Sequence, residues 1–304
     1  MGRIAEALKR AEQERRAAAA KPVATEGGGA PIVDVPSGLV EALDGPEGFA
    51  TDDETKPVEL VEGLSEALVP YYERSSLIAE QYRSLRTRLL SQNPQCEHRV
   101  LAITSAVPKE GKSVTTLNLG AIFAEVRHLK VLVVDGDFRR SSLAKMLNQP
   151  EGPGLADALG GRASFDEIVR DTPIPNLRFM PAGSTKGRSA AELLASAATR
   201  TVFKRVHNEY HYIFVDTPPA TTVTDVGIIG QMCSGVIMVV RLNRTHEAAG
   251  KRAVRLLQSN NIRIIGALIV GRETSAAQYG YGYGYGHHYD WYYNYYYNQS
   301  DQNG

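Results

Sequence analysis

Between residues 71 and 278 the chain alternates short hydrophobic runs with amphipathic stretches. The runs have the length of strands and are rich in β-branched side chains; they cover residues 99–104, 130–134, 177–181, 212–215, 235–241 and 263–270. The stretches with helical spacing cover residues 113–127, 190–208, 222–233 and 246–260. Continuous apolar strands that alternate with helices are typical of a parallel sheet covered on both faces. The pattern therefore predicts an α/β fold, a doubly wound and mostly parallel sheet with helices on both faces.

The two ends of the chain lack this pattern. Residues 1–20 place Ile4, Leu8 and Ala11 on one face, which predicts a short helix. Residues 21–70 are rich in Gly, Pro and acidic residues and cannot offset their ordering entropy by burial, so we expect a disordered acidic linker. Residues 279–304 alternate Gly with Tyr and hold no aliphatic side chain, which indicates a disordered, tyrosine-rich tail. One packed domain is therefore expected at residues 71–278.

Charge is segregated along the chain, although its 34 Lys and Arg balance its 34 Asp and Glu. Residues 22–70 hold one basic and eleven acidic side chains, whereas residues 71–278 hold 27 basic and 18 acidic ones. A basic domain favours an anionic ligand such as a nucleotide. Nothing in the pattern singles out nucleic acid, and we expect no nucleic-acid partner.

Two classes of protein are excluded by composition. The two cysteines, Cys96 and Cys233, cannot supply the disulfide framework of a small secreted domain. No hydrophobic run approaches the roughly 20 residues that a membrane-spanning helix needs, and the first residues lack the apolar segment of a signal peptide. We therefore expect a cytoplasmic protein.

A candidate phosphate-binding loop follows the first predicted strand. The segment SAVPKEGKS, residues 105–113, lies between that strand and a predicted helix, so backbone N–H groups and the positive end of the helix dipole would face phosphates. Lys112 would place its charge on the β- and γ-phosphates, and Ser113 would give its hydroxyl to Mg²⁺. The expected nucleotide-binding residues are Val107, Pro108, Lys109, Glu110, Gly111, Lys112, Ser113 and Val114. The alternative is a chance match in an ordinary loop.

Three carboxylates follow two of the predicted strands. Asp135 and Asp137 end the second strand, and Asp216 ends a later one. The carboxyl ends of parallel strands meet at one crevice, where doubly wound sheets bind their ligands. Carboxylates brought together need a cation, and Mg²⁺ prefers oxygen ligands. The sequence thus predicts an ATP–Mg²⁺ site, with Ser113 and the three acids around the metal; solvated turn acids are the alternative.

Five features together resemble one family. They are the AVPKEGKS loop, the element Asp135-Gly-Asp137-Phe-Arg139, the strand IFVDTPP, an E-x-x-R-x-x-R helix with Glu80, Arg83 and Arg86, and the terminal tyrosine cluster. In this order they resemble the bacterial tyrosine kinases of polysaccharide synthesis and export. The opening segment MGRIAEALKRAEQER is similar to the start of cytoplasmic members that lack a fused membrane domain.

The resemblance implies a P-loop fold and an ATP-dependent protein-tyrosine autokinase. Lys112, Asp135, Asp137 and Asp216 would be the catalytic residues, with Asp135 or Asp137 accepting the tyrosine proton. The autophosphorylated residues would be Tyr279, Tyr281, Tyr283, Tyr285, Tyr289, Tyr292, Tyr293, Tyr295, Tyr296 and Tyr297. Arg139 and Arg140 would either steer phosphates or form structural ion pairs.

The resemblance also implies partners and regulation. Glu80, Arg83 and Arg86 would contact a neighbouring subunit in a ring-type homo-oligomer. An integral-membrane polysaccharide co-polymerase would activate the kinase and hold it at the inner face of the cell membrane, and a tyrosine phosphatase would reverse the modification. Each phosphorylation adds about −1.5 to −2 charge, so we expect it to loosen the assembly and to regulate polymer synthesis and export.

Two other functions remain open. A partition- or septum-placement-type ATPase, which dimerises with nucleotide and phosphorylates nothing, shares the loop and the fold, but typically has a lysine where Val107 stands. A nucleotide-binding scaffold without turnover is the third possibility. The sequence also departs from the kinases near Val270, where an Asn would contact adenine, so the adenine contacts stay undefined.

Overall fold

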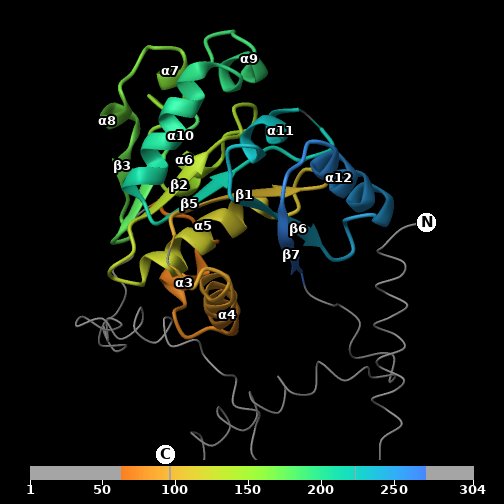
Figure 1. The fold of residues 1–304 in the computed structure, drawn as a ribbon. Coiled ribbons are helices and arrows are strands. Elements are labelled where there is room, and N and C mark those ends of the chain that lie inside the picture. Colours follow the sequence, from red (N-terminus) through yellow and green to blue (C-terminus); the bar gives the residue numbers. More distant parts are fainter. Residues whose placement is uncertain (1–62, 96, 223, 272–304) are drawn as a thin grey trace, which may run out of the picture. The chain divides into compact units, whose positions relative to one another are not determined.

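The computed structural model describes residues 63–95, 97–222 and 224–271 (Figure 1). Its helices are α3 (Val69–Tyr72), α4 (Leu77–Ser91), α5 (Lys112–Ala124), α6 (Leu143–Met146), α7 (Leu155–Leu159), α8 (Phe165–Ile168), α9 (Ala190–Leu194), α10 (Ala197–Glu209), α11 (Asp225–Gly230) and α12 (Glu247–Ser259). Its strands are β1 (Arg99–Ser105), β2 (Val131–Asp135), β3 (Arg170–Asp171), β4 (Leu177–Met180), β5 (Tyr212–Asp216), β6 (Gly235–Arg241) and β7 (Ile264–Val270). Within these ranges no helix combines the length and the hydrophobicity needed to cross a bilayer.

The strands form one sheet in the order β3-β4-β2-β5-β1-β6-β7. Every pair is parallel except β3 with β4, so the predicted α/β fold is confirmed. β5 lies between β1 and β2 and aligns Asp135 directly with Asp216. This register brings the phosphate loop, which follows β1, beside the ends of β2 and β5.

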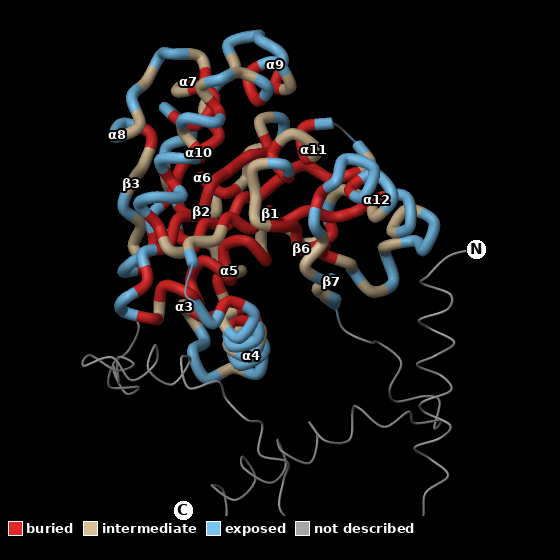
Figure 2. Tube along the Cα trace, in the orientation of Figure 1, coloured by how far each residue is buried: buried red, intermediate tan, exposed pale blue. Residues whose placement is uncertain are grey.

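Alternate residues of each central strand pack on opposite faces of the sheet. Leu101 and Ile103 of β1 join one core with α5, while Val100 and Ala102 join the other core. The first core is covered by α3, α4, α5 and α6, and the second by α7, α9, α10, α11 and α12 (Figures 1 and 2). Figure 2 shows the buried strands as a continuous layer between exposed helix faces. Burial on both faces explains why the strands are apolar throughout.

The helix that follows the phosphate loop, α5, is buried along its length. Residues 115–124 are all buried, because the sheet lies on one side of the helix and α4 packs on another. Gly120 permits the close approach to β2: a Cβ there would lie 2.5 Å from Val133 Cγ2. The base of the phosphate loop is therefore held by a rigid, well-packed element.

Three features differ from the sequence prediction. The predicted helix at residues 190–208 is two helices, α9 and α10, because Ser196 is extended (ψ 157°) and begins a new helix. The antiparallel strand β3 has two residues, too few for a recognisable pattern. Leu64 and Leu68 were expected in the linker but are buried in the first core, where Asn118 of α5 bonds the backbone of Ala67 and Val69. The packed region therefore begins before residue 71.

The other terminal predictions fall outside the described residues. These are the helix at residues 1–20, the linker as far as residue 62, the tyrosine-rich tail at 279–304, and Cys96. Cys233 is a free thiol whose burial raises its pKa to about 12, consistent with an unreactive structural cysteine.

Candidate active site

The phosphate loop connects β1 to α5 and ends at a left-handed residue. Gly111 has φ 97° and stands at the N-cap of α5, a conformation that L-residues with a Cβ rarely adopt. Lys112 and Ser113 open the helix, so their side chains start where the free backbone N–H groups and the positive dipole end are located. The predicted loop therefore has the local structure that phosphate binding requires.

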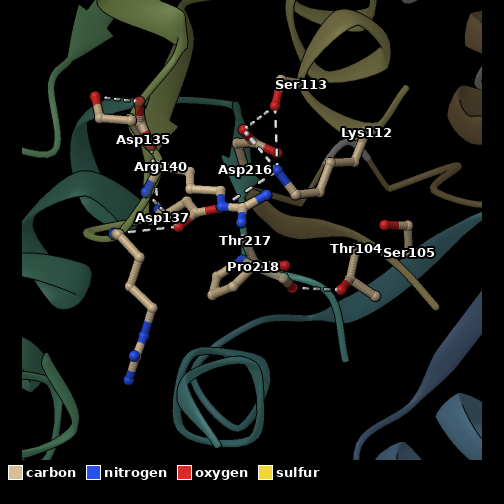
Figure 3. Close-up of polar contacts among 12 residues, drawn as sticks. Thr104, Ser105, Lys112, Ser113, Asp135, Asp137, Arg140, Asp216, Thr217 and Pro218 are labelled. Atoms are coloured by element: carbon tan, nitrogen blue, oxygen red, sulfur yellow. Dashed lines mark hydrogen bonds and ion pairs between the residues drawn. The ribbon is translucent and has the colours of Figure 1, made fainter. Parts of the chain in front are cut away.

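Lys112 and Ser113 both contact Asp216. Ser113 Oγ donates to Asp216 Oδ2 at 2.6 Å, and Lys112 Nζ lies 3.7 Å from the same oxygen (Figure 3). Lys112 Nζ is also 3.4 Å from Asp137 Oδ2 and 3.2 Å from Ser113 Oγ. Residues more than 100 positions apart in sequence thus meet in one charged cluster at the carboxyl ends of β1, β2 and β5.

The two acids of the Asp135–Asp137 pair have different surroundings. Asp135 accepts three hydrogen bonds within its own turn, from Asp137 N at 3.1 Å, Ser141 Oγ at 2.9 Å and Leu143 N at 3.3 Å. Asp137 uses Oδ1 to accept the backbone N–H groups of Arg139 and Arg140 at 3.2 and 3.0 Å. Its other oxygen faces Lys112. Asp135 therefore holds the turn, and Asp137 presents a carboxylate oxygen to the site.

The cluster has the electrostatics of a cation site. Burial raises the pKa of Asp216 to about 7, opposed by Lys112 and reinforced by the nearby carboxylates Asp135 and Asp137. Burial likewise raises the pKa of Asp135 to about 6. Asp216 Oδ1 is buried and accepts no hydrogen bond in the described part of the chain. Asp137 and Asp216, the latter with one unpaired oxygen, together with the Ser113 hydroxyl supply the kind of oxygen ligands that Mg²⁺ prefers, whereas Asp135 uses both of its oxygens within its own turn.

A buried glutamate ties the phosphate loop to the segment after β6. Glu110 is fully buried; its Oε2 accepts Val107 N at 2.9 Å, and its Oε1 accepts the hydroxyl of Thr245. Thr245 in turn accepts Arg241 N at 2.8 Å, and Arg241 Nη1 donates to Lys109 O at 3.3 Å. Thr245 was not identified from the sequence, because a single threonine in a loop carries no signal of a contact 135 residues away.

A second pairing missed from the sequence involves Asp225. Its Oδ2 lies 3.4 Å from Arg139 Nε, and its buried Oδ1 has no partner among the described residues. Asp225 is the first residue of α11, which follows the segment after Asp216. Its position at the start of a helix, a few residues beyond the end of a strand, was the clue that the sequence offered. Of the two roles expected for Arg139, the ion pair is thus present, while 56% of its side chain stays exposed.

The three charged residues of α4 have contacts within the protomer. Arg86 is buried and donates to Ile122 O at 2.5 Å and to Glu125 Oε2 at 2.8 Å, which fastens α4 to the end of α5. Arg83 pairs with both Glu125 and Glu80. Glu80 keeps 58% of its side chain exposed. Of the three, Glu80 is therefore the side chain most available to a neighbouring subunit.

The end of β7 lies beside the phosphate loop. A Cβ on Gly111 would stand 3.7 Å from Val270 Cγ2, and Leu242 N donates to Val270 O at 2.9 Å. The position at which this sequence departs from the kinases therefore lies close to the phosphate loop, and the residues that the structure describes extend one position further, to Gly271. The ten tail tyrosines lie outside the described residues.

Known proteins share both this sequence and this fold. A sequence profile described as an AAA domain matches residues 98–251. Tyrosine-protein kinase YwqD of Bacillus subtilis is 30% identical over 210 residues, covering 69% of this chain and 88% of YwqD. Putative tyrosine-protein kinase CapB of Staphylococcus aureus is 28% identical over 194 residues, covering 64% of this chain and 84% of CapB. The crystal structure of the chimerical protein CapA2B2 superposes with a TM-score of 0.63 at 25% identity, over 68% of this chain and 91% of that chain.

Proposed function

The chain belongs to the bacterial tyrosine-protein kinases, and from that premise we propose that it transfers the γ-phosphoryl group of ATP to tyrosines of its own C-terminal segment. The observation that carries the proposal is that polar atoms of Ser113, Asp137 and Asp216 all lie within 3.7 Å of Lys112 Nζ, at the start of the helix that follows the phosphate loop. A terminal segment with ten tyrosines and no Lys or Arg supplies a matching substrate.

The residues of the cluster divide the work of binding. Backbone N–H groups from Lys109 to Val114 hold the phosphates, while Val107 and Pro108 shape the start of the loop; Lys112 neutralises charge that accumulates on the phosphates. Ser113, Asp216 and Asp137 would hold Mg²⁺, with Asp135 supporting their arrangement from the adjoining turn. When bound, Mg²⁺ draws negative charge from the β- and γ-phosphate oxygens.

Asp137 is our candidate for the proton acceptor. A tyrosine hydroxyl oxygen forms a bond to the γ-phosphorus while the bond to the β,γ-bridging oxygen breaks, leaving ADP. The phenolic proton passes to a carboxylate oxygen, and Asp137 Oδ2 faces the site. Asp135 has both of its oxygens occupied by hydrogen bonds within its turn, which makes it a positioning residue.

Phosphotyrosine formation is the direct test. Purified chain incubated with ATP and Mg²⁺ should accumulate phosphotyrosine, and Lys112→Met should lower the initial rate by at least ~100-fold, because the charge on the phosphates is lost. Lys204→Met on the exposed face of α10 is the matched control and should behave as the wild type. A parallel reaction should include a candidate integral-membrane co-polymerase segment as activator.

Three outcomes separate the possible functions. ATP hydrolysis without phosphotyrosine, with activator present, would support the partition-type ATPase instead. Nucleotide binding without hydrolysis or phosphotyrosine would support a scaffold. Phosphotyrosine that appears only with activator supports the kinase and its dependence on a membrane partner at the inner face of the membrane.

We also propose that the kinase assembles into a homo-oligomer and that tail phosphorylation loosens it, so that a cognate phosphatase and the kinase together regulate extracellular polysaccharide synthesis and export. The exposed Glu80, with Leu77 and Ile78 exposed at 49% and 48% beside it on α4, supports α4 as the contact. Glu80→Lys should reduce the sedimentation coefficient of the assembly, whereas Lys204→Met should not. Unchanged sedimentation of both the Glu80→Lys and an Ile78→Asp chain would contradict the α4 contact.

A further inference from the structure

A hollow lies at the amino ends of the parallel strands, away from the phosphate loop. It has a volume of about 540 Å³ and is lined by Glu97, His98, Arg99, His207, Ser234 and Arg263. They lie at or just before the first residues of β1, β6 and β7, at the amino ends of these parallel strands, and in the last turn of α10. Because Lys112 and Asp216 lie at the carboxyl ends of the same sheet, the hollow is separate from the active site. We call it the basic pocket.

The basic pocket has more positive than negative charge. Arg263 is exposed and has no ion pair within the ranges the structure describes. Arg99 Nη2 lies 3.3 Å from Glu97 Oε2, and its Nε is buried without an acceptor among the described residues. The one acid of the pocket therefore offsets one of its two guanidinium groups. Ser234 Oγ accepts Val100 N at 3.2 Å, which leaves its hydroxyl proton free to donate.

The His98 ring forms a hydrogen bond to a backbone carbonyl. Its Nδ1 lies 2.6 Å from His207 O, and only a protonated nitrogen can donate to a carbonyl. His211 behaves differently: its Nδ1 accepts Lys130 N at 2.9 Å, so protonation there would break a bond.

We propose that the basic pocket binds phosphotyrosine from the C-terminal segment of this chain. Guanidinium groups bind phosphate through paired, charge-assisted hydrogen bonds, and clusters of arginine are the usual means of recognising phosphorylated side chains. Arg99 and Arg263 supply paired donors, the Ser234 hydroxyl supplies a further donor, and the volume accommodates an aromatic ring with its phosphate. The proposal rests on the tail autophosphorylation proposed above.

The position of the tail favours it as the occupant. Arg263 immediately precedes β7, and the tail begins after β7 ends. Returning along the seven residues of β7 takes about 23 Å, or roughly seven extended residues. All the tail tyrosines, from Tyr279 on, lie at least that far from Gly271 in sequence. With no Lys or Arg in the tail, phosphorylation makes it a strong anion and gives it an affinity for a basic site that the unmodified tail lacks.

A binding measurement with a synthetic peptide tests the proposal independently of catalysis. A fluorescein-labelled peptide of residues 289–300, with phosphotyrosine at Tyr293, is titrated with the phosphatase-treated full chain and followed by anisotropy. The phosphopeptide should bind at least ~10-fold more tightly than its unphosphorylated form. Arg263→Ala should weaken binding by ~10-fold, and Glu97→Gln should strengthen it by roughly threefold, because the competing acid is removed.

Controls identify both the site and the ligand. Arg255→Ala, an exposed arginine of α12, should leave the affinity unchanged. Equal binding of both peptides, or an affinity that neither Arg263→Ala nor Glu97→Gln alters, would overturn the proposal. Inorganic phosphate that competes as well as the phosphopeptide would also overturn it, since the pocket would then bind a free anion. If the chain binds the phosphopeptide but forms no phosphotyrosine with ATP, the proposed phosphotyrosine site stands and the proposed autokinase activity is refuted.

Discussion

At the scale of single residues, two aspartates separated by one glycine perform different tasks. Asp135 is the last residue of β2 and is fully buried. Both of its carboxylate oxygens accept hydrogen bonds from its own turn. Asp137 stands beyond the strand and directs Oδ2 at Lys112. Neither residue type nor spacing distinguishes them; the path of the backbone after the strand does. Their substitutions should therefore fail in different ways.

We predict that Asp137→Asn lowers the rate of phosphotyrosine formation by at least ~100-fold, because the proton acceptor and a metal ligand are removed. The free energy of unfolding should change little. Asp135→Asn should instead lower the free energy of unfolding by about 1–3 kcal/mol, since the amide nitrogen cannot accept from Ser141 or Leu143 N. Urea unfolding and an autophosphorylation assay on both chains measure the difference. If Asp135→Asn lowered phosphotyrosine formation more than Asp137→Asn did and left the chain stable, the roles assigned to the two aspartates would be reversed.

At the scale of elements, α4 and α5 form one unit behind the phosphate loop. Arg86 of α4 donates to a carbonyl in the last turn of α5 and to Glu125 just after it, so charge and hydrogen bonds satisfy a helix end that is largely buried. At the opposite end of α5, the hydrogen bond from Thr245 to Glu110 joins the phosphate loop to the segment after β6. The loop is thereby held between two elements. Any neighbour that binds α4 would act on a helix whose first residues are Lys112 and Ser113.

Arg86→Ala should destabilise the chain by about 2–3 kcal/mol, because Ile122 O and one oxygen of Glu125 lose a buried charged donor. Arg88→Ala, on the exposed side of the same helix, should change the free energy of unfolding by no more than ~0.5 kcal/mol. Chemical denaturation of both variants provides the measurement. If the Arg86→Ala and Arg88→Ala chains were equally stable, Arg86 would not stabilise the protomer, and a role in contact between subunits would be favoured.

At the scale of the whole molecule, opposite edges of one sheet have different chemistry. The carboxyl edge gathers the acids and Lys112, and the amino edge gathers arginines and histidines. His98 and His211 lie there with ring centroids 5.0 Å apart. Burial, then the nearby charges of His98, His128 and Lys130, lower the pKa of His211. The neutral ring is also required by the hydrogen bond from Lys130 N.

This arrangement predicts a pH dependence of global stability. Because the folded pKa of His211 lies below its unfolded value of about 6.5, the unfolded chain binds the extra proton first as the pH falls. Stability is complete above about pH 6.5 and decreases below it until the folded histidine is also protonated. His211→Asn keeps an acceptor for Lys130 N and should flatten this part of the curve. His246→Asn, on an exposed residue, should leave the slope unchanged; an unaltered slope in His211→Asn would contradict the assignment.

Much of the fold and of the site could be read from local pattern. Six of the seven strands were predicted, because a run of β-branched residues specifies a strand whatever it pairs with. The phosphate loop was also identifiable, since glycine, lysine and serine act within a few residues of one another at a helix start. The pairing of Arg86 with Glu125 and the contact of Glu110 with Thr245 were not, because they join side chains 39 and 135 residues apart.

The sequence by itself determined six of the seven strands, the helix that follows the phosphate loop and the residues that follow each of those strands, because these depend on neighbours along the chain. The tertiary structure decided that β5 lies between β1 and β2, so that Asp216 aligns with Asp135 beside Lys112. It also decided that Arg86 faces inward and that arginines at or just before the first residues of β1 and β7 share one pocket. The reason is physical: strand order and packing result from burial over the whole domain, which no local segment encodes.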